Sequence, residues 1–202
     1  VTGDFDPLFR EWPGANVLDS IVLGSKALKN ALIEEVRCRE GKATVHSPPS
    51  PQGNDLTAFT RTKVEPMVRG LFSRKESEPV LALLERSVVF LTQEHIEPHI
   101  HQASLNTAWE IANIYLASTG AERLDRGSQH IVGFSVETIC YVSLEYFSDE
   151  DPFADFLVHE TAHVFHNCKR MTAGLQETRR REWLLPIKYS KRETFAYACE
   201  AY

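Results

Sequence analysis

Residues 156–165 read Phe-Leu-Val-His-Glu-Thr-Ala-His-Val-Phe and contain the pattern His159-Glu160-x-x-His163. The flanking residues are apolar, so this stretch predicts a mostly buried helix with one polar face. A step of four residues in an α-helix turns by about 400°, which leaves the two imidazoles roughly 40° apart. Both histidines can therefore reach a single metal ion.

Glu160 lies about 100° around the helix from His159. Its carboxylate can reach a metal-bound water without becoming a ligand itself, which is the position of a general base. Imidazole nitrogens and a carboxylate oxygen in an open four-coordinate site suit zinc, which is the expected ion. The alternative is a buried helix with structural histidines, but burying these polar groups without a partner costs free energy.

A catalytic zinc site needs a third protein ligand and leaves the fourth position to water. Glu193 and Glu200 are the candidates, because they are seven residues apart on a predicted helix and so share a face. Glu193 also completes the capping-box pattern Ser190-Lys-Arg-Glu193, in which it would bond its own helix start. His166 lies about 300° around the helix from His163, so we expect it beside the site or at the surface. Spacing alone does not choose between the two glutamates.

The two stretches 156–165 and 193–202 resemble the gluzincin metallopeptidases. Within that family, the chain more specifically resembles the lethal-factor-like members, whose third metal ligand is the glutamate at the start of a Glu-x-Phe-Ala helix. It implies a zincin-like fold, Glu193 as the third ligand, and hydrolysis of a peptide or protein substrate. Thermolysin-like members have an aspartate four residues after the ligand glutamate, where this chain has Tyr197.

An oxyanion formed during hydrolysis usually needs a donor besides the metal, and tyrosine often supplies it. Tyr189 and Tyr197 each lie four residues from Glu193, and either could serve. For each of them, an ordinary half-buried aromatic is the alternative. In its order along the chain, the strand of residues 134–146 resembles the edge strand that pairs with extended substrate in zincins, so substrate binding by strand addition is expected.

Periodicity and turn signals predict an α+β fold around these motifs. The resemblance to the zincins implies a mixed sheet whose edge strand precedes the metal-binding helix. Residues 1–75 are expected to form a small α/β lobe, and residues 76–202 the catalytic domain. The predicted helices cover residues 25–41, 78–97, 98–118, 152–167 with Asp151 as the cap, and 190 to the end. The predicted strands cover residues 44–47, 56–64 and 130–147, the last as one bent strand or a hairpin.

The composition is that of an ordinary globular protein, with 43% hydrophobic and 25% charged residues among 202. The net charge of −6 disfavours nucleic acid and anionic lipid as partners. No apolar run is long enough to cross a bilayer, so membrane insertion is not expected. The widely spaced cysteines indicate free thiols and favour the cytoplasm, but secretion stays open because the chain begins at Val1. These cysteines are Cys38, Cys140, Cys168 and Cys199.

His95, His99 and His101 form a second concentration of histidines, beside Glu94 and Glu97. They match no recognised ligand spacing, so a polar corner between helices is preferred over a second metal site. Two alternatives to a peptidase stay open at this point. They are a zinc hydrolase of a non-peptide amide and a non-catalytic binding module with the same fold.

Overall fold

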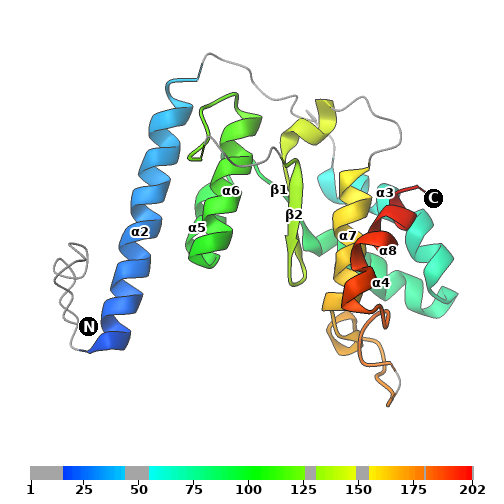
Figure 1. Cartoon of the computed structure of the whole chain (residues 1–202). Coiled ribbons are helices and arrows are strands. Elements are labelled where there is room, and N and C mark those ends of the chain that lie inside the picture. The colour runs from blue at the N-terminus through cyan, green and yellow to red at the C-terminus, as the bar shows by residue number, and fades with distance from the viewer. Residues whose placement is uncertain (1–15, 44–54, 126–130, 149–154, 180, 202) are drawn as a thin grey trace. The chain divides into compact units, whose positions relative to one another are not determined.

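The protein has an α+β fold that is mostly helical, with one small mixed sheet of three strands (Figure 1). A computed structural model describes its residues in five ranges, which are 16–43, 55–125, 131–148, 155–179 and 181–201. The chain divides into two compact units, each made of two segments. The first unit comprises residues 1–46 and 92–128, and the second comprises residues 47–91 and 129–202.

This division differs from the expected boundary near residue 75. Residues 56–64, which were expected to be a strand of an N-terminal lobe, belong to a helix of the second unit. The other strand predicted for that lobe, at residues 44–47, lies outside the described residues. All described residues of the candidate metal site lie in the second unit.

The first unit contains three described helices, α2 (Val17–Glu40), α5 (Ile96–Gln102) and α6 (Leu105–Ser118). Helix α2 begins eight residues before the predicted cap at Ser25, because Asn16 caps it by accepting a hydrogen bond from the backbone N–H of Asp19. The single helix predicted over 98–118 is two helices, because the chain becomes extended before the cap of α6, Ser104.

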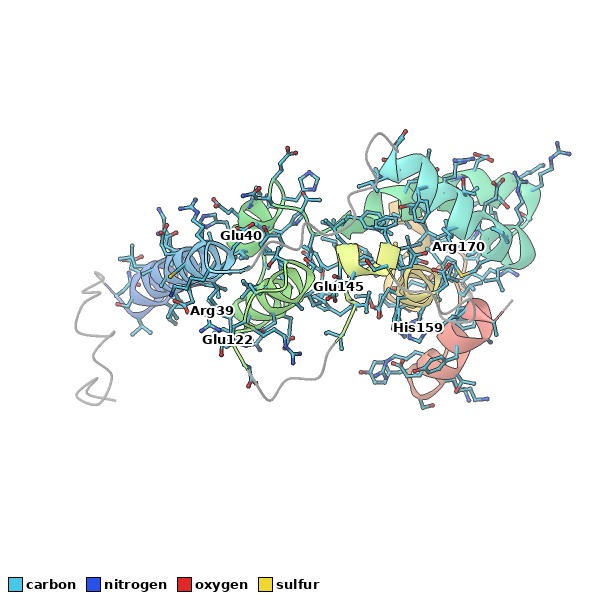
Figure 2. All side chains as sticks on the ribbon, turned by 90° about the horizontal axis from the view of Figure 1, so that it is seen from above. Arg39, Glu40, Glu122, Glu145, His159 and Arg170 are labelled. Atoms are coloured by element: carbon cyan, nitrogen blue, oxygen red, sulfur yellow. The ribbon has the colours of Figure 1, made fainter. Side chains whose placement is uncertain are left out.

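Polar contacts near its C-terminal end connect α2 to the rest of the first unit. The Tyr115 hydroxyl of α6 donates to the Glu40 carboxylate at 2.6 Å. The Arg39 guanidinium donates to the carbonyl oxygens of Glu122 and Arg123, and Arg39, Glu40 and Glu122 are labelled in Figure 2. These bonds satisfy polar groups near the C-terminal end of α2.

The second unit begins with helices α3 (Leu56–Leu71) and α4 (Arg74–Ser87). The predicted strand over residues 56–64 is wrong. Asp55 caps a helix there, because its carboxylate accepts hydrogen bonds from the backbone N–H groups of Thr57 and Ala58. Val64, Met67 and Val68 lie on the buried face of this helix. Packing of this face against the core outweighs the strand-compatible local pattern.

The sheet has the strand order β1-β3-β2. Strand β1 (Val88–Phe90) pairs in parallel with β3 (Ile139–Val142), and β2 (Gly133–Val136) pairs antiparallel with β3. Of the two alternatives for residues 130–147, the hairpin is therefore confirmed, but only over residues 133–142, because Leu144–Ser148 form a 3₁₀ turn. The predicted helix over 78–97 is wrong beyond Ser87, because the chain turns extended at that point to enter the sheet.

Helices α7 (Phe156–Asn167) and α8 (Arg192–Glu200) carry the candidate site. Asp155 caps α7, while the predicted cap Asp151 lies outside the described residues. Helix α8 ends at Glu200, and its N-cap, Lys191, makes no side-chain hydrogen bond. The described part of the second unit also contains the 3₁₀ turns η1 (Leu144–Ser148), η2 (Arg170–Ala173) and η3 (Tyr189–Lys191).

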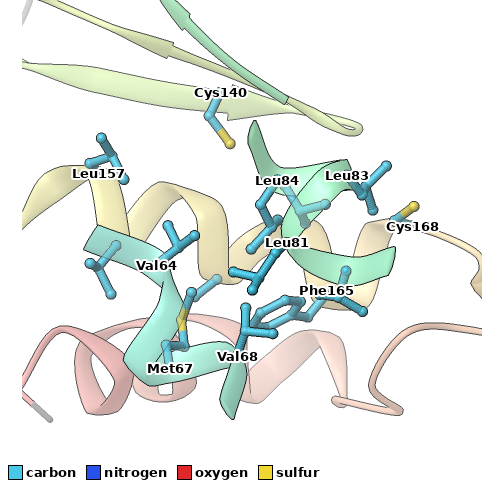
Figure 3. Packing of buried hydrophobic residues seen from close by; sticks show 14 of the residues in the cluster. Val64, Met67, Val68, Leu81, Leu83, Leu84, Cys140, Leu157, Phe165 and Cys168 are labelled. Atoms are coloured by element: carbon cyan, nitrogen blue, oxygen red, sulfur yellow. The ribbon is translucent and has the colours of Figure 1, made fainter. Parts of the chain in front are cut away.

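The core of the second unit is built from α3, α4, β3 and α7 (Figure 3). Val68, Leu81 and Phe165 are fully buried in it, and the Cys140 thiol of β3 is buried there as well. All four cysteines are free, as their spacing predicted. Within the described ranges, no helix combines the length and the apolar character that a membrane span requires.

Candidate metal centre

Helix α7 presents His159 and His163 one turn apart, with both side chains buried and their ring centroids 5.1 Å apart. The start of this helix is held by the Asp155 carboxylate. It accepts from the Val158 N–H at 3.2 Å and from the Tyr146 hydroxyl at 3.0 Å. Because the helix start is anchored, the direction of the histidine face is set by the surrounding unit.

Glu193, in the first turn of α8, completes a group of three ligands. Its Oε2 atom lies 3.6 Å from the Nε2 atoms of both His159 and His163. Among the described residues, this is the one group whose ligand atoms could hold a metal ion, and those atoms all lie within 4.8 Å of one another. The Glu193 side chain is 54% exposed, so the group is open to solvent on one side. Three protein ligands with one open side match the requirement of a catalytic metal.

Glu200 lies two turns further along α8 and contacts the other nitrogen of the same imidazole. Its Oε2 atom is 3.1 Å from Nδ1 of His159. The two ring nitrogens of His159 point in different directions, so Glu193 and Glu200 lie on opposite sides of this ring. The sequence spacing had not distinguished between these two glutamates. The capping-box interpretation of Glu193 has no counterpart in the structure, because the helix starts without a side-chain cap.

The pKa of His163 is lowered to about 4, and burial is the largest cause. Glu193 acts in the opposite direction, while the neighbouring His159, His166 and Arg192 contribute to the decrease. His163 is therefore a neutral imidazole at neutral pH. This is the form that offers a nitrogen lone pair to a metal ion.

Glu160 faces the β2–β3 hairpin. Ser135 of β2 hydrogen-bonds to its carboxylate through both the side chain and the backbone. Burial raises the pKa of Glu160, and the bonds from Ser135 act against this increase. The Cys140 thiol of β3 donates to the Glu160 carbonyl oxygen at 3.3 Å. A carboxylate with a raised pKa beside a metal site has the property of a proton acceptor.

Ser135 is a residue of the site that sequence reasoning missed. Its only sequence signal is its position in the strand that precedes α7, and no spacing rule connects it to Glu160. The contact exists because β2 lies against α7. In Figure 1, the hairpin and α7 stand next to each other within the second unit.

The two tyrosines proposed as oxyanion donors have different surroundings. Tyr189 is 72% exposed and stacks on the Arg192 guanidinium, 3.8 Å from the ring centroid. The Tyr197 ring packs edge-to-face on His159 at 4.6 Å, although the residue is 63% exposed. Neither contact tests an oxyanion role, which stays a prediction for both.

The remaining histidines lie outside the three-ligand group. His166 is half-buried, with its ring 5.5 Å from that of His163, and its Nδ1 atom has no hydrogen-bond partner among the described residues. His95 and His99 pack edge-to-face at 6.5 Å in the first unit. In the described part of the chain, no ligand group includes these two residues or His101.

His159 is labelled in Figure 2, between α7 and α8 of the second unit. Comparisons with known proteins add no family to this geometry. No protein-family model matches the chain, and neither a curated protein nor a solved structure is significantly similar to it.

Proposed function

We propose that this protein is a zinc-dependent peptidase with a zincin-like catalytic unit. The observation that carries the proposal is the convergence of His159 Nε2, His163 Nε2 and Glu193 Oε2, with Glu160 adjacent in the same helix. The donor set of two imidazoles and one carboxylate, with His163 neutral, fits zinc. When bound, zinc would lower the pKa of a coordinated water and polarise a carbonyl group.

The chain's own residues would supply the proton transfer. Glu160 would accept a proton from the attacking water and pass it to the departing amine. Ser135 would hold the Glu160 carboxylate, while the raised pKa of Glu160 would favour acceptance of the proton. Tyr189 and Tyr197 remain the candidates for stabilising the oxyanion.

The edge strand supports a peptide as the substrate. The Ser143 N–H donates to the Val132 carbonyl oxygen across the hairpin, and hydrogen-bonded pairs alternate along an antiparallel ladder. The backbone groups of Gly133 and Ser135 therefore point away from β3. The Ser135 N–H bonds to Glu160, so the groups offered at the open edge of the sheet are the Gly133 N–H and the carbonyl oxygens of Gly133 and Ser135. An extended peptide can pair with such an edge.

The test combines metal content with cleavage. We expect purified protein to contain about one zinc per chain, and His159→Ala, His163→Ala and Glu193→Ala each to lose it. His101→Ala, which changes an exposed histidine in the first unit, is the matched control and should retain zinc. Cleavage of a peptide library should stop on chelation and return when zinc is added.

Equal and negligible zinc in all of these proteins would overturn the metal site. Stoichiometric zinc without any peptide cleavage would overturn the peptidase assignment. That result would favour a non-peptide amide as substrate or a structural role for the metal.

A further inference from the structure

His159 has a glutamate at each ring nitrogen, and both glutamates come from α8. Glu193 faces Nε2 at 3.6 Å, and Glu200 faces Nδ1 at 3.1 Å. We propose that Glu200 is a positioning residue that keeps the Nδ1 proton on His159 and directs its Nε2 lone pair at the metal. This inference rests on the proposed function for the identity of the metal, but the effect of Glu200 on the imidazole needs no metal.

Hydrogen-bond chemistry determines the direction of this contact. An ionised carboxylate can only accept, and a neutral imidazole has one donor nitrogen and one acceptor nitrogen. When Glu200 accepts from Nδ1–H, Nε2 is left without a proton. That is the tautomer in which Nε2 can bind a metal ion.

Burial makes the contact strong enough to determine the tautomer. The Glu200 side chain is 9% exposed and that of His159 is 11% exposed, so water competes weakly with the bond. The Tyr197 ring, packed edge-to-face on His159, further restricts rotation of the imidazole. By contrast, Glu193 is largely exposed, as expected of a group that would face the ion and the solvent.

The geometry of α8 explains why Glu200 performs this task. Two residues seven apart on a helix share a face, so Glu193 and Glu200 both point toward α7. Ala196 is completely buried between them, which allows a close approach of the two helices. One short helix therefore supplies both the third ligand and the group that orients the first.

The first test uses metal-free protein. Nitrogen-15 NMR at a pH where imidazoles are neutral distinguishes protonated from unprotonated ring nitrogens, and His159 is assigned by comparison with His159→Gln. We expect Nδ1 of His159 to carry the proton in the wild type. In Glu200→Ala this preference should be lost, and in Glu200→Gln it should be kept in part because the amide oxygen can still accept.

The second test is a competitive zinc titration of the same variants. Glu200→Ala should bind zinc about 10–100-fold more weakly than the wild type, and Glu200→Gln should show a smaller loss. Glu110→Ala and Glu110→Gln are the matched controls, because Glu110 is an exposed helical glutamate in the first unit. Both controls should bind zinc with wild-type affinity.

Two results would overturn the role of Glu200. One is a proton on Nε2 rather than Nδ1 of His159 in the metal-free wild type, and the other is unchanged zinc affinity in Glu200→Ala. If Glu200→Ala does not fold, the wild-type tautomer and the Glu200→Gln titration decide instead. Absence of zinc binding by the wild type would contradict the proposed function, while the tautomer would still decide the role of Glu200.

Discussion

Two effects of opposite sign act on the carboxylate of Glu160. Burial against the hairpin favours its neutral form, whereas hydrogen bonds from Ser135 favour the charged form. The carboxylate is thus held in place without being locked into either protonation state. This balance suits a group that must accept a proton and release it again within one reaction cycle.

Replacement of Glu160 by glutamine tests this residue directly. The amide has the same shape but cannot accept the proton, so Glu160→Gln should bind zinc as tightly as the wild type and lose about 10²–10⁴-fold in kcat. Zinc affinity and peptide cleavage are measured on the same preparation, with Glu110→Gln as the control. Cleavage at the wild-type rate would refute the general-base role, and loss of zinc would identify Glu160 as a ligand instead.

Strand β2 passes unusually close to its neighbours at Gly133. A Cβ atom at this position would lie 2.9 Å from the Tyr141 carbonyl oxygen and 3.7 Å from Cγ of Glu160. The first distance is shorter than a tolerable contact, and the oxygen belongs to the paired backbone of β3. Glycine therefore allows the hairpin to form directly beside the proposed general base.

Gly133→Ala is accordingly expected to destabilise the protein by about 1–3 kcal/mol, because the hairpin must shift to admit the methyl group. Gly41→Ala is the matched control. Its added Cβ would have an ordinary contact of 3.4 Å, and the backbone there is helical with φ −64°. The control should be neutral or stabilising by up to about 1 kcal/mol. Urea unfolding of both variants provides the comparison, and equal stabilities would contradict the close approach at β2.

The dependence of stability on pH is a property of the whole molecule to which the site contributes. His163 has a folded-state pKa of about 4 against an ordinary value of 6.5. Below pH 6.5 the unfolded chain takes up a proton that the folded chain does not, so folding becomes less favourable as the pH falls. This contribution is fully present above about pH 6.5 and is lost as the pH falls toward about 4.

We therefore expect the free energy of unfolding of the metal-free protein to decrease with falling pH across this window. Glu160 acts in the opposite direction, because its raised pKa favours the folded state at low pH. Comparison with His163→Gln, which retains Glu160, isolates the histidine. The variant should show a shallower decrease in urea titrations at several pH values, and identical decreases would exclude His163 as the source.

The elements near the site were predicted with unequal success, for a physical reason. A hairpin within residues 130–147 and the helix that carries His159 were predicted correctly in type, because each has a strong local pattern. Their bounds are narrower than predicted, since the hairpin covers residues 133–142 and the helix begins at Phe156. Residues 56–64 form a helix although their local alternation also suits a strand. In such an ambiguous segment, a capping residue and packing on the core decide the conformation.

By itself, the sequence determined the pair of imidazoles on one helical face and the position of Glu160 beside it, because these relations depend only on helix geometry. It also determined that the four cysteines are too widely spaced for a C-x-x-C pair. Only the tertiary structure decided which glutamate of α8 faces which nitrogen of His159, and that Ser135 reaches Glu160. These contacts join segments far apart in the chain, and their geometry depends on how α8 and β2 pack against α7 rather than on any local spacing.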